Sequence, residues 1–253
     1  VSKFLGVKGY CRPLTAANLH IRTLYSDGRE EVGQHLMNQM KFLEENCSSQ
    51  SNVIAAKIMQ IDLVEYLHFE GRQESKTCDI DIVSSDLVAS ADLIVFPMGS
   101  FFASVLVNLL PKGVGRAIVN RKCPKVYIPN TGFDPEMRGY TLVECVQLLI
   151  DMVQTDHNEQ DLNEDIQNEN NIPVKDILNF VLIDTQNCEY AVEVDQTAIE
   201  DLGVIVIDVP LVNMETMNDQ QHSSSPLSSN ECGRKSTRLD PLKVVEVLLS
   251  LAS

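Results

Sequence analysis

Ala91-Asp-Leu-Ile-Val-Phe-Pro-Met-Gly-Ser-Phe-Phe-Ala-Ser-Val-Leu-Val-Asn-Leu-Leu110 is the stretch that decides the fold. Its apolar run, Leu93 to Phe96, is typical of a strand that is buried on both faces of a parallel sheet. Pro97 ends this strand because proline has no N–H to donate, and Gly99 permits a sharp turn. Ser100 then stands at an N-cap position, so we expect an apolar helix over residues 101–110.

A strand, a Gly-Ser turn and a helix N-terminus together predict an anion site. Unpaired N–H groups and the positive end of the helix dipole would both face a phosphate group bound at Gly99 and Ser100. The alternative is an ordinary strand-to-helix connection that uses glycine and serine without any ligand. Both interpretations stay open at the level of residue types.

The following residues repeat the strand–helix pattern. We expect a helix over Val114 to Asn120, a second strand over Lys125 to Ile128 and an amphipathic helix over Tyr140 to Met152. This alternation predicts an α/β fold of the Rossmann-like type, a doubly wound, mainly parallel sheet with helices on both faces. Ligands bind such sheets beyond the carboxyl ends of the strands, where the Gly99 turn and the loop from Pro129 to Gly139 both fall.

Outside this centre, the sequence predicts a hairpin at Asp27-Gly28, which follows a half-buried strand, with residues 69–77 as a loop. Buried strands are expected at 180–183 and 204–207, and a last helix begins at Asp240-Pro241. We therefore expect a single α/β domain over residues 1–253. Its polar segments, an acidic insertion at 154–171 and a Ser-rich segment at 214–236, are predicted to be disordered and mobile.

Composition excludes several classes of function. The 253 residues carry a formal net charge of −16, so neither nucleic acid nor an anionic membrane is an expected partner. No apolar run approaches the roughly 20 residues that span a bilayer. Seven dispersed cysteines lack zinc-ligand spacing and indicate reduced thiols in a cytoplasmic protein. No Ser-His-Asp or Cys-His order can be argued.

The central stretch resembles the CofD-like family, which contains 2-phospho-L-lactate transferase and the gluconeogenesis factor proteins. The resemblance rests first on Ala91 to Val95, Gly99-Ser100, Ser104 and Asn108 to Leu110. It continues over the second strand, the loop after it and the ends of the chain, at Lys125 to Tyr127, Asn130, Pro135-Glu136, Gly139 to Thr141, Asp27-Gly28, Val32-Gly33 and Asp240-Pro241.

Two features depart from the family pattern. Phe96 replaces the first glycine of the family's Gly-Pro-Gly-Ser turn, and Met98 follows the proline, which would change what the pocket accepts. The family's glycine-rich first strand-to-helix turn has no counterpart before Asp27-Gly28. We therefore expect this chain to lack the N-terminal segment of the family's fold and, with it, part of the nucleotide site.

The resemblance implies a transferase of phosphorus-containing groups. Such an enzyme would move a phospholactyl-type group from a nucleoside diphosphate-linked donor to the hydroxyl of a deazaflavin-type acceptor, with Mg²⁺. The alternative is a non-catalytic regulator of the gluconeogenesis factor type that binds a nucleotide sugar. A truncated copy without activity is a third interpretation, and a homo-oligomer is left open.

The expected ligand-binding residues come from the turn and the loop: Gly99, Ser100, Ser104, Asn130 and Arg138. Asp134 and Glu136 are the candidates for a metal-bound water, because magnesium prefers carboxylate oxygen. Ordinary surface acids and a surface arginine are the competing interpretations for these loop residues. Phe101, Phe102 and Tyr140 would form an aromatic slot for a flat acceptor or, on the simpler interpretation, pack in the core.

Overall fold

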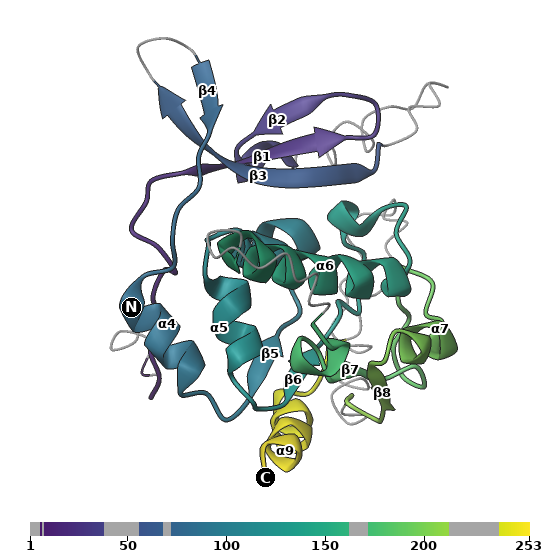
Figure 1. Cartoon of the computed structure of the whole chain (residues 1–253). Coiled ribbons are helices and arrows are strands. Elements are labelled where there is room, and N and C mark those ends of the chain that lie inside the picture. Colours follow the sequence, from purple (N-terminus) through teal and green to yellow (C-terminus); the bar gives the residue numbers. More distant parts are fainter. Residues whose placement is uncertain (1–5, 7, 38–55, 68–71, 162–171, 213–237) are drawn as a thin grey trace, which may run out of the picture.

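The parallel sheet predicted from the apolar runs forms the centre of the molecule (Figure 1). The computed structural model describes residues 6, 8–37, 56–67, 72–161, 172–212 and 238–253. Within these ranges four strands pair in the order β5-β6-β7-β8, all in parallel. The strands are short: β5 (Ile94–Phe96), β6 (Lys125–Tyr127), β7 (Phe180–Ile183) and β8 (Ile205–Asp208).

Alternating side chains of these strands fill two separate cores. Tyr127 and Val181 point into the larger core, whereas Val126 and Leu182 point into the smaller one on the other face. All four side chains are at most 2% exposed, so β6 and β7 are buried on both faces, as was predicted for residues 180–183. The predicted burial of residues 204–207 is wrong at Ile205, which is 57% exposed because β8 is the last strand of the sheet among the described residues. β5 is an edge strand among the described residues, and its Ile94 is only half-buried.

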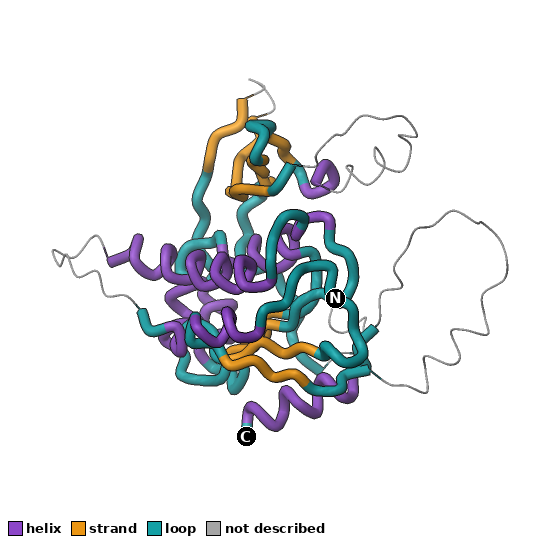
Figure 2. Tube along the Cα trace, turned by 90° about the vertical axis from the view of Figure 1, so that its right-hand side faces the viewer, coloured by secondary structure: helices purple, strands orange, loops and turns teal. Residues whose placement is uncertain are grey.

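Helices cover both faces of the sheet, which confirms the predicted fold class. One face carries α4 (Ile82–Ala89), α5 (Val114–Asn120), α6 (Leu142–Asp161) and α7 (Gln196–Asp201). The opposite face carries α9 (Pro241–Ala252), as the side view in Figure 2 shows. Asp240 caps α9 by accepting a hydrogen bond from the Leu242 N–H at 2.8 Å, so the predicted cap and its Pro241 are confirmed.

A second, antiparallel sheet lies on the far side of α6 from the parallel sheet (Figure 1). Its order is β2-β1-β3-β4, with bounds β1 (His20–Tyr25), β2 (Glu30–Val32), β3 (Ile58–Leu67) and β4 (Arg72–Ser75). The predicted hairpin is confirmed, and Gly28 supplies the positive φ of 85°. The prediction of a loop over residues 69–77 is wrong at β4, because pairing with β3 orders this polar segment.

Two helical predictions need correction. The apolar segment after Ser100 forms a π-helical turn, η1 (Phe101–Val105), and a 3-10 turn, η2 (Leu106–Leu109), instead of one regular helix. α6 continues to Asp161, so helical backbone covers the start of the segment predicted to be disordered from residue 154. The remaining short helices are α2 (Gln34–Met37), η3 (Pro135–Met137) and η4 (Val174–Asp176). Residues 162–171 and 213–237 lie outside the described part.

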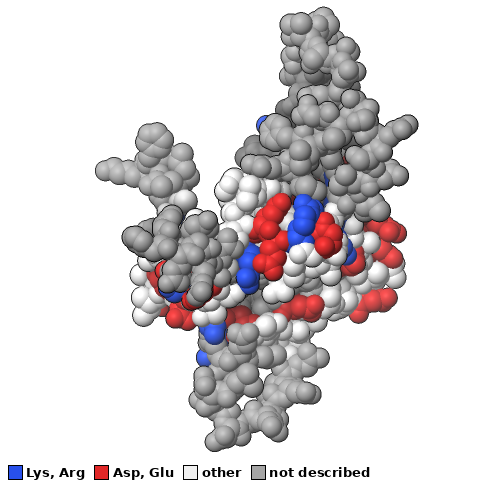
Figure 3. Space-filling model, turned by 90° about the horizontal axis from the view of Figure 1, so that it is seen from above, with Lys and Arg blue, Asp and Glu red and all other residues white. Residues whose placement is uncertain are grey.

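Charged side chains of both signs lie on the face that carries the antiparallel sheet. Figure 3 shows acidic side chains spread along this face, with basic side chains between them singly or in small groups. This matches the overall excess of 36 acidic over 20 basic residues.

In the described ranges, no helix is both long enough and apolar enough to cross a membrane.

Candidate functional site

The Gly99–Ser100 turn begins where β5 ends, at the carboxyl edge of the parallel sheet. The Ser100 side chain makes no capping hydrogen bond, so the predicted N-cap role is not what the structure shows. The carbonyl oxygen of Ser100 instead accepts the N–H of Ser104 at 2.8 Å, which starts the π-helical turn. The first N–H groups of that turn must therefore find other partners.

Two buried carboxylates from the loop after β6 supply those partners. Asp134 Oδ2 accepts the N–H of Phe101 at 2.8 Å. Glu136 Oε2 accepts the N–H groups of Phe102 and Ala103 at 2.9 and 2.8 Å. Asp134 and Glu136 are only 5% and 2% exposed. The N–H groups that follow Ser100 in the predicted anion site thus bind carboxylates of the chain itself.

The outer part of the same turn stays open. Among the described residues, the N–H groups of Gly99 and Ser100 have no hydrogen-bond partner. Asn130 fixes the turn from the other side, because its Nδ2 donates to the carbonyl oxygen of Gly99 at 2.7 Å and to Asp134 Oδ2 at 3.3 Å. Two backbone donors therefore stay unbonded, among the described residues, in a turn whose shape is held by side chains 30 and more residues away.

A cavity of about 390 Å³ adjoins this turn. Its lining comes from three segments: Met98, the loop from Asn130 to Phe133, and Arg238 with Leu239 just before α9. Phe133 is 60% exposed and offers a flat ring to the cavity wall. Arg238 was not predicted as a site residue, because it follows a Ser-rich segment in the sequence and only the packing of α9 brings it to this edge.

The other predicted binding residues lie close to the turn or the loop. Ser104 packs against the turn, where a Cβ added to Gly99 would meet the Ser104 Cβ at 3.3 Å. The Arg138 guanidinium lies over the Phe133 ring, 5.6 Å from its centroid, and is held by contacts within the chain. The structure therefore brings Gly99, Ser100, Ser104 and Asn130 together and sets Arg138 behind Phe133.

The geometry gives Asp134 and Glu136 a different task from metal binding. Both carboxylates are directed at backbone N–H groups, and Asp134 Oδ1 also accepts the N–H of Glu136 at 3.0 Å. No group of three or more potential metal ligands occurs in the described ranges. Both carboxylates are thus bound by backbone N–H groups, and magnesium binding by Asp134 and Glu136 stays an untested prediction.

The aromatic residues proposed as an acceptor slot pack in the core. Phe101 and Phe102 are 0% and 2% exposed and contact each other edge to face, with ring centroids 5.3 Å apart. The Tyr140 hydroxyl donates to the carbonyl oxygen of Ile58, and burial raises the pKa of Tyr140 to about 12. The simpler interpretation of these three residues therefore agrees with their positions, and Phe133 is the aromatic side chain that faces the cavity.

The chain is similar to known proteins in sequence. A profile of the family described as 2-phospho-L-lactate transferase CofD matches residues 1–212. A protein of Thermotoga maritima that is provisionally named gluconeogenesis factor is 24% identical over 152 residues, which cover 59% of this chain and 40% of that protein. The gluconeogenesis factor of Bacillus subtilis is 37% identical over 65 residues, 25% of this chain and 20% of that protein.

The fold has solved counterparts. A crystal structure of a UPF0052 family member from Bacillus halodurans superposes with a TM-score of 0.64 at 20% identity. The match covers 98% of this chain and 64% of the other. The chain thus spans less than two thirds of the length of each of these relatives, and the likeness to the solved structure supports the fold alone.

Proposed function

This chain belongs to the 2-phospho-L-lactate transferase CofD family, and on that premise we propose that it binds a nucleoside diphosphate-linked small molecule at the Gly99–Ser100 turn. One observation carries the proposal. The N–H groups of Gly99 and Ser100 are unbonded among the described residues. Met98, which precedes this turn, and Asn130, which is hydrogen-bonded to it, line a cavity that Arg238 also lines. Backbone donors next to an arginine are a common arrangement for binding phosphate oxygens.

The acidic side chains next to the turn would disfavour an anionic ligand unless a positively charged side chain also contacts that ligand. The buried carboxylates of Asp134 and Glu136 lie next to the turn and would repel a phosphate group. Arg238 lines the cavity and would offset this repulsion by direct contact with the phosphate group. Met98 and Phe133 would contact the less polar part of the ligand, since both are substantially exposed there.

Transfer of a phospholactyl-type group to a deazaflavin-type hydroxyl is the second candidate, and the exposed Phe133 ring favours it. An aromatic ring at a cavity wall can stack on a flat acceptor or on a nucleotide base. Among the described residues that line the cavity, no aspartate, glutamate, histidine or lysine could take the acceptor proton. This second observation favours the alternative, a non-catalytic nucleotide-sugar-binding regulator.

Ligand titration with a matched charge variant tests the binding proposal. We expect GDP or a UDP-sugar to raise the melting temperature of the full chain, because a ligand that binds only the folded state stabilises it. Arg238→Gln should weaken the affinity about 10-fold, because the variant loses a charge-assisted hydrogen bond to the ligand. Lys8→Gln removes one charge from an exposed residue outside the cavity and should change the affinity little.

The outcomes separate the candidates. If no nucleotide shifts the melting temperature with or without Mg²⁺, the binding proposal is wrong. If Arg238→Gln and Lys8→Gln weaken binding equally, the ligand responds to overall charge and not to this cavity. Mass spectrometry of a mixture with a phospholactyl nucleotide donor and a deazaflavin then decides between transfer and regulation. A joined product indicates a transferase, whereas binding without product indicates a regulator.

A further inference from the structure

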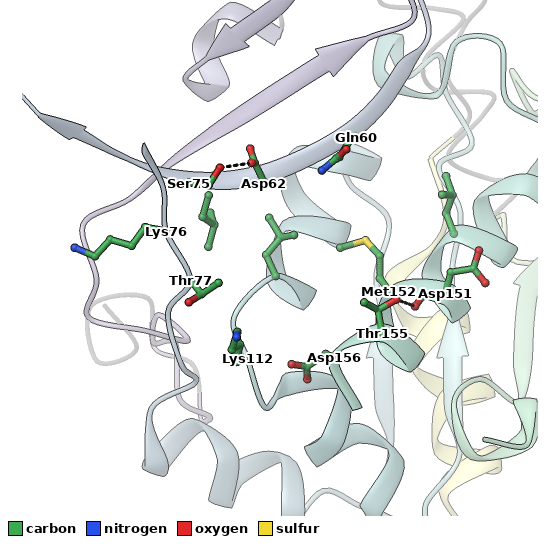
Figure 4. Close-up of a pocket in the computed structure, with 13 residues that line it drawn as sticks. Gln60, Asp62, Ser75, Lys76, Thr77, Lys112, Asp151, Met152, Thr155 and Asp156 are labelled. Atoms are coloured by element: carbon green, nitrogen blue, oxygen red, sulfur yellow. Dashed lines mark hydrogen bonds between the residues drawn. The ribbon is translucent and has the colours of Figure 1, made fainter. Parts of the chain in front are cut away.

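A larger cavity, of about 460 Å³, lies between the antiparallel sheet and α6 (Figure 4). We call it the sheet–helix cavity. Gln60 and Asp62 of β3 lie above it, Thr77 lies at one side, and Lys112 and Asp156 lie below it. It shares no lining residue with the cavity at the Gly99–Ser100 turn. Its volume is in the range of small-molecule sites, about 300 to 1,000 Å³.

Aliphatic side chains give the sheet–helix cavity an apolar wall. Leu63, Leu110, Leu148 and Met152 all line it, and each is only half-buried. Leu148 and Met152 are four residues apart on α6 and therefore share one face of the helix. Figure 4 shows the Met152 side chain directed into the space between α6 and β3. The apolar body of a ligand would cover surface that the protein itself leaves partly exposed.

The charged groups around the cavity already have partners inside the chain. Asp62 pairs with Arg22 and accepts the Ser75 hydroxyl at 3.0 Å. Lys76 pairs with Glu65, and Lys112 also has a partner of its own. Asp156 accepts the N–H groups of a glycine turn, and the Asp151 carboxylate points away from the cavity in Figure 4. A charged ligand would find no uncommitted counter-ion at these positions.

Uncommitted hydrogen-bonding groups remain at two places. The Thr77 hydroxyl and the Gln60 amide line the cavity and have no hydrogen-bond partner among the described residues. The Thr155 hydroxyl also lines the cavity but donates to the carbonyl oxygen of Asp151 at 2.8 Å. The cavity thus combines an apolar wall with two available polar groups and compensated charges.

We propose that the sheet–helix cavity binds an uncharged amphipathic small molecule. Its apolar body packs against Leu110, Leu148 and Met152, and its hydroxyl or amide group bonds Thr77 or Gln60. A molecule in this position bridges β3 and α6 and therefore stabilises the packing of the antiparallel sheet on the α/β core. This site is independent of the proposed nucleotide site, so either can fail without the other.

Three probes of one shape test the proposal on the full chain. Cyclohexylmethanol, cyclohexylmethylamine and cyclohexanecarboxylate carry the same ring with a neutral, a positive and a negative group. Binding is followed by the NMR signal of the ¹³C-labelled Met152 methyl group, which Met152→Leu identifies. We expect a saturable shift with the alcohol and at least about 10-fold weaker binding of both ions, because a desolvated charge lacks a partner there.

Two threonine variants locate the polar contact. Thr77→Val should weaken binding of the alcohol about 2- to 10-fold, because it removes the available hydroxyl. Thr155→Val removes a hydroxyl that is already bonded and should leave the affinity unchanged. Both positions are exposed, so both variants should fold. Thr77→Trp fills the cavity and should abolish the Met152 shift.

The proposal is overturned by any one of the following results. These are a Met152 signal that does not move with the alcohol, a shift that does not saturate, or a shift that survives in Thr77→Trp. Equal binding of all three probes would also overturn it, since charge would then not matter. GDP should leave the Met152 signal in place, and this separates the sheet–helix cavity from the nucleotide site.

Discussion

At two glycine turns of this chain, backbone N–H groups donate hydrogen bonds to buried carboxylates of distant segments. At the Gly99–Ser100 turn, Asp134 and Glu136 bind the three N–H groups that follow the turn. At the turn before α5, Asp156 of α6 binds the N–H groups of Gly113, Gly115 and Arg116 at 2.7 to 3.3 Å. The same kind of contact therefore stabilises both helix starts.

The two turns differ in what they leave unbonded. Both Asp156 oxygens accept from the second turn, and α6 packs so closely there that a Cβ on Gly115 would lie 2.6 Å from the Val153 carbonyl oxygen. The first turn has more space at Gly99, and its two outer N–H groups stay available. Acidic side chains at the helix starts thus bind the N–H groups of both turns, and at the first turn they leave the N–H groups of Gly99 and Ser100 unbonded among the described residues.

The largest effect is expected at the first turn. Glu136→Ala leaves the buried N–H groups of Phe102 and Ala103 without an acceptor and should lower the free energy of unfolding by about 2 to 5 kcal/mol. Urea denaturation measures this change. Glu136→Gln keeps one acceptor oxygen and should lose less. Equal losses in the two variants would mean that the charge, and not the hydrogen bonds, stabilises the turn.

The second turn provides a matched pair on one helix. Asp156→Ala should destabilise the fold by about 2 to 4 kcal/mol, because backbone donors at the start of α5 lose their acceptor. Asp151→Ala, an exposed position on the same helix, should change stability by no more than about 0.5 kcal/mol. Urea denaturation of both variants tests the contrast. A loss at Asp151 that matches the loss at Asp156 would refute the assigned role of Asp156.

Alanine at the two glycines measures how tightly each turn is enclosed. Gly115→Ala should cost about 1 to 3 kcal/mol, because the new methyl group would overlap the Val153 carbonyl oxygen. Gly99→Ala should cost less than about 1 kcal/mol, since its Cβ would meet only the small Ser104 side chain at 3.3 Å. Thermal denaturation ranks the two. The reverse order would show that the first turn is the closed one.

A pH-dependent effect is expected at Cys145, a fully buried residue of α6. Burial raises the pKa of the Cys145 thiol from 9.0 to about 12. Between these values the unfolded chain loses a proton that the folded chain keeps, so stability falls as pH rises through this window. The loss is at most about 1.4 kcal/mol for each pH unit. Cys145→Ala should flatten this dependence in urea titrations above pH 9, and an unchanged slope in this variant would refute the assignment to Cys145.

The sequence by itself determined the parts of the fold that depend on local pattern. Apolar runs indicated β5 to β8, and the Asp240-Pro241 pair indicated the start of α9. The Gly99–Ser100 turn and Asn130 were also correctly expected to lie close together, because parallel strands end at one edge. These features follow from periodicity, from proline and glycine geometry, and from the topology that such strands impose.

Only the tertiary structure decided which polar groups meet. Asp134 and Glu136 are ordinary loop acids in the sequence, and their burial on N–H groups 33 or 34 residues away has no local signal. Arg238 reaches the cavity only because α9 packs under the parallel sheet. Strand β4 is polar and is ordered by pairing with β3, not by its own pattern. Local sequence reports what a segment can form, whereas the free energy of burying a charge depends on partners that long-range packing brings to it.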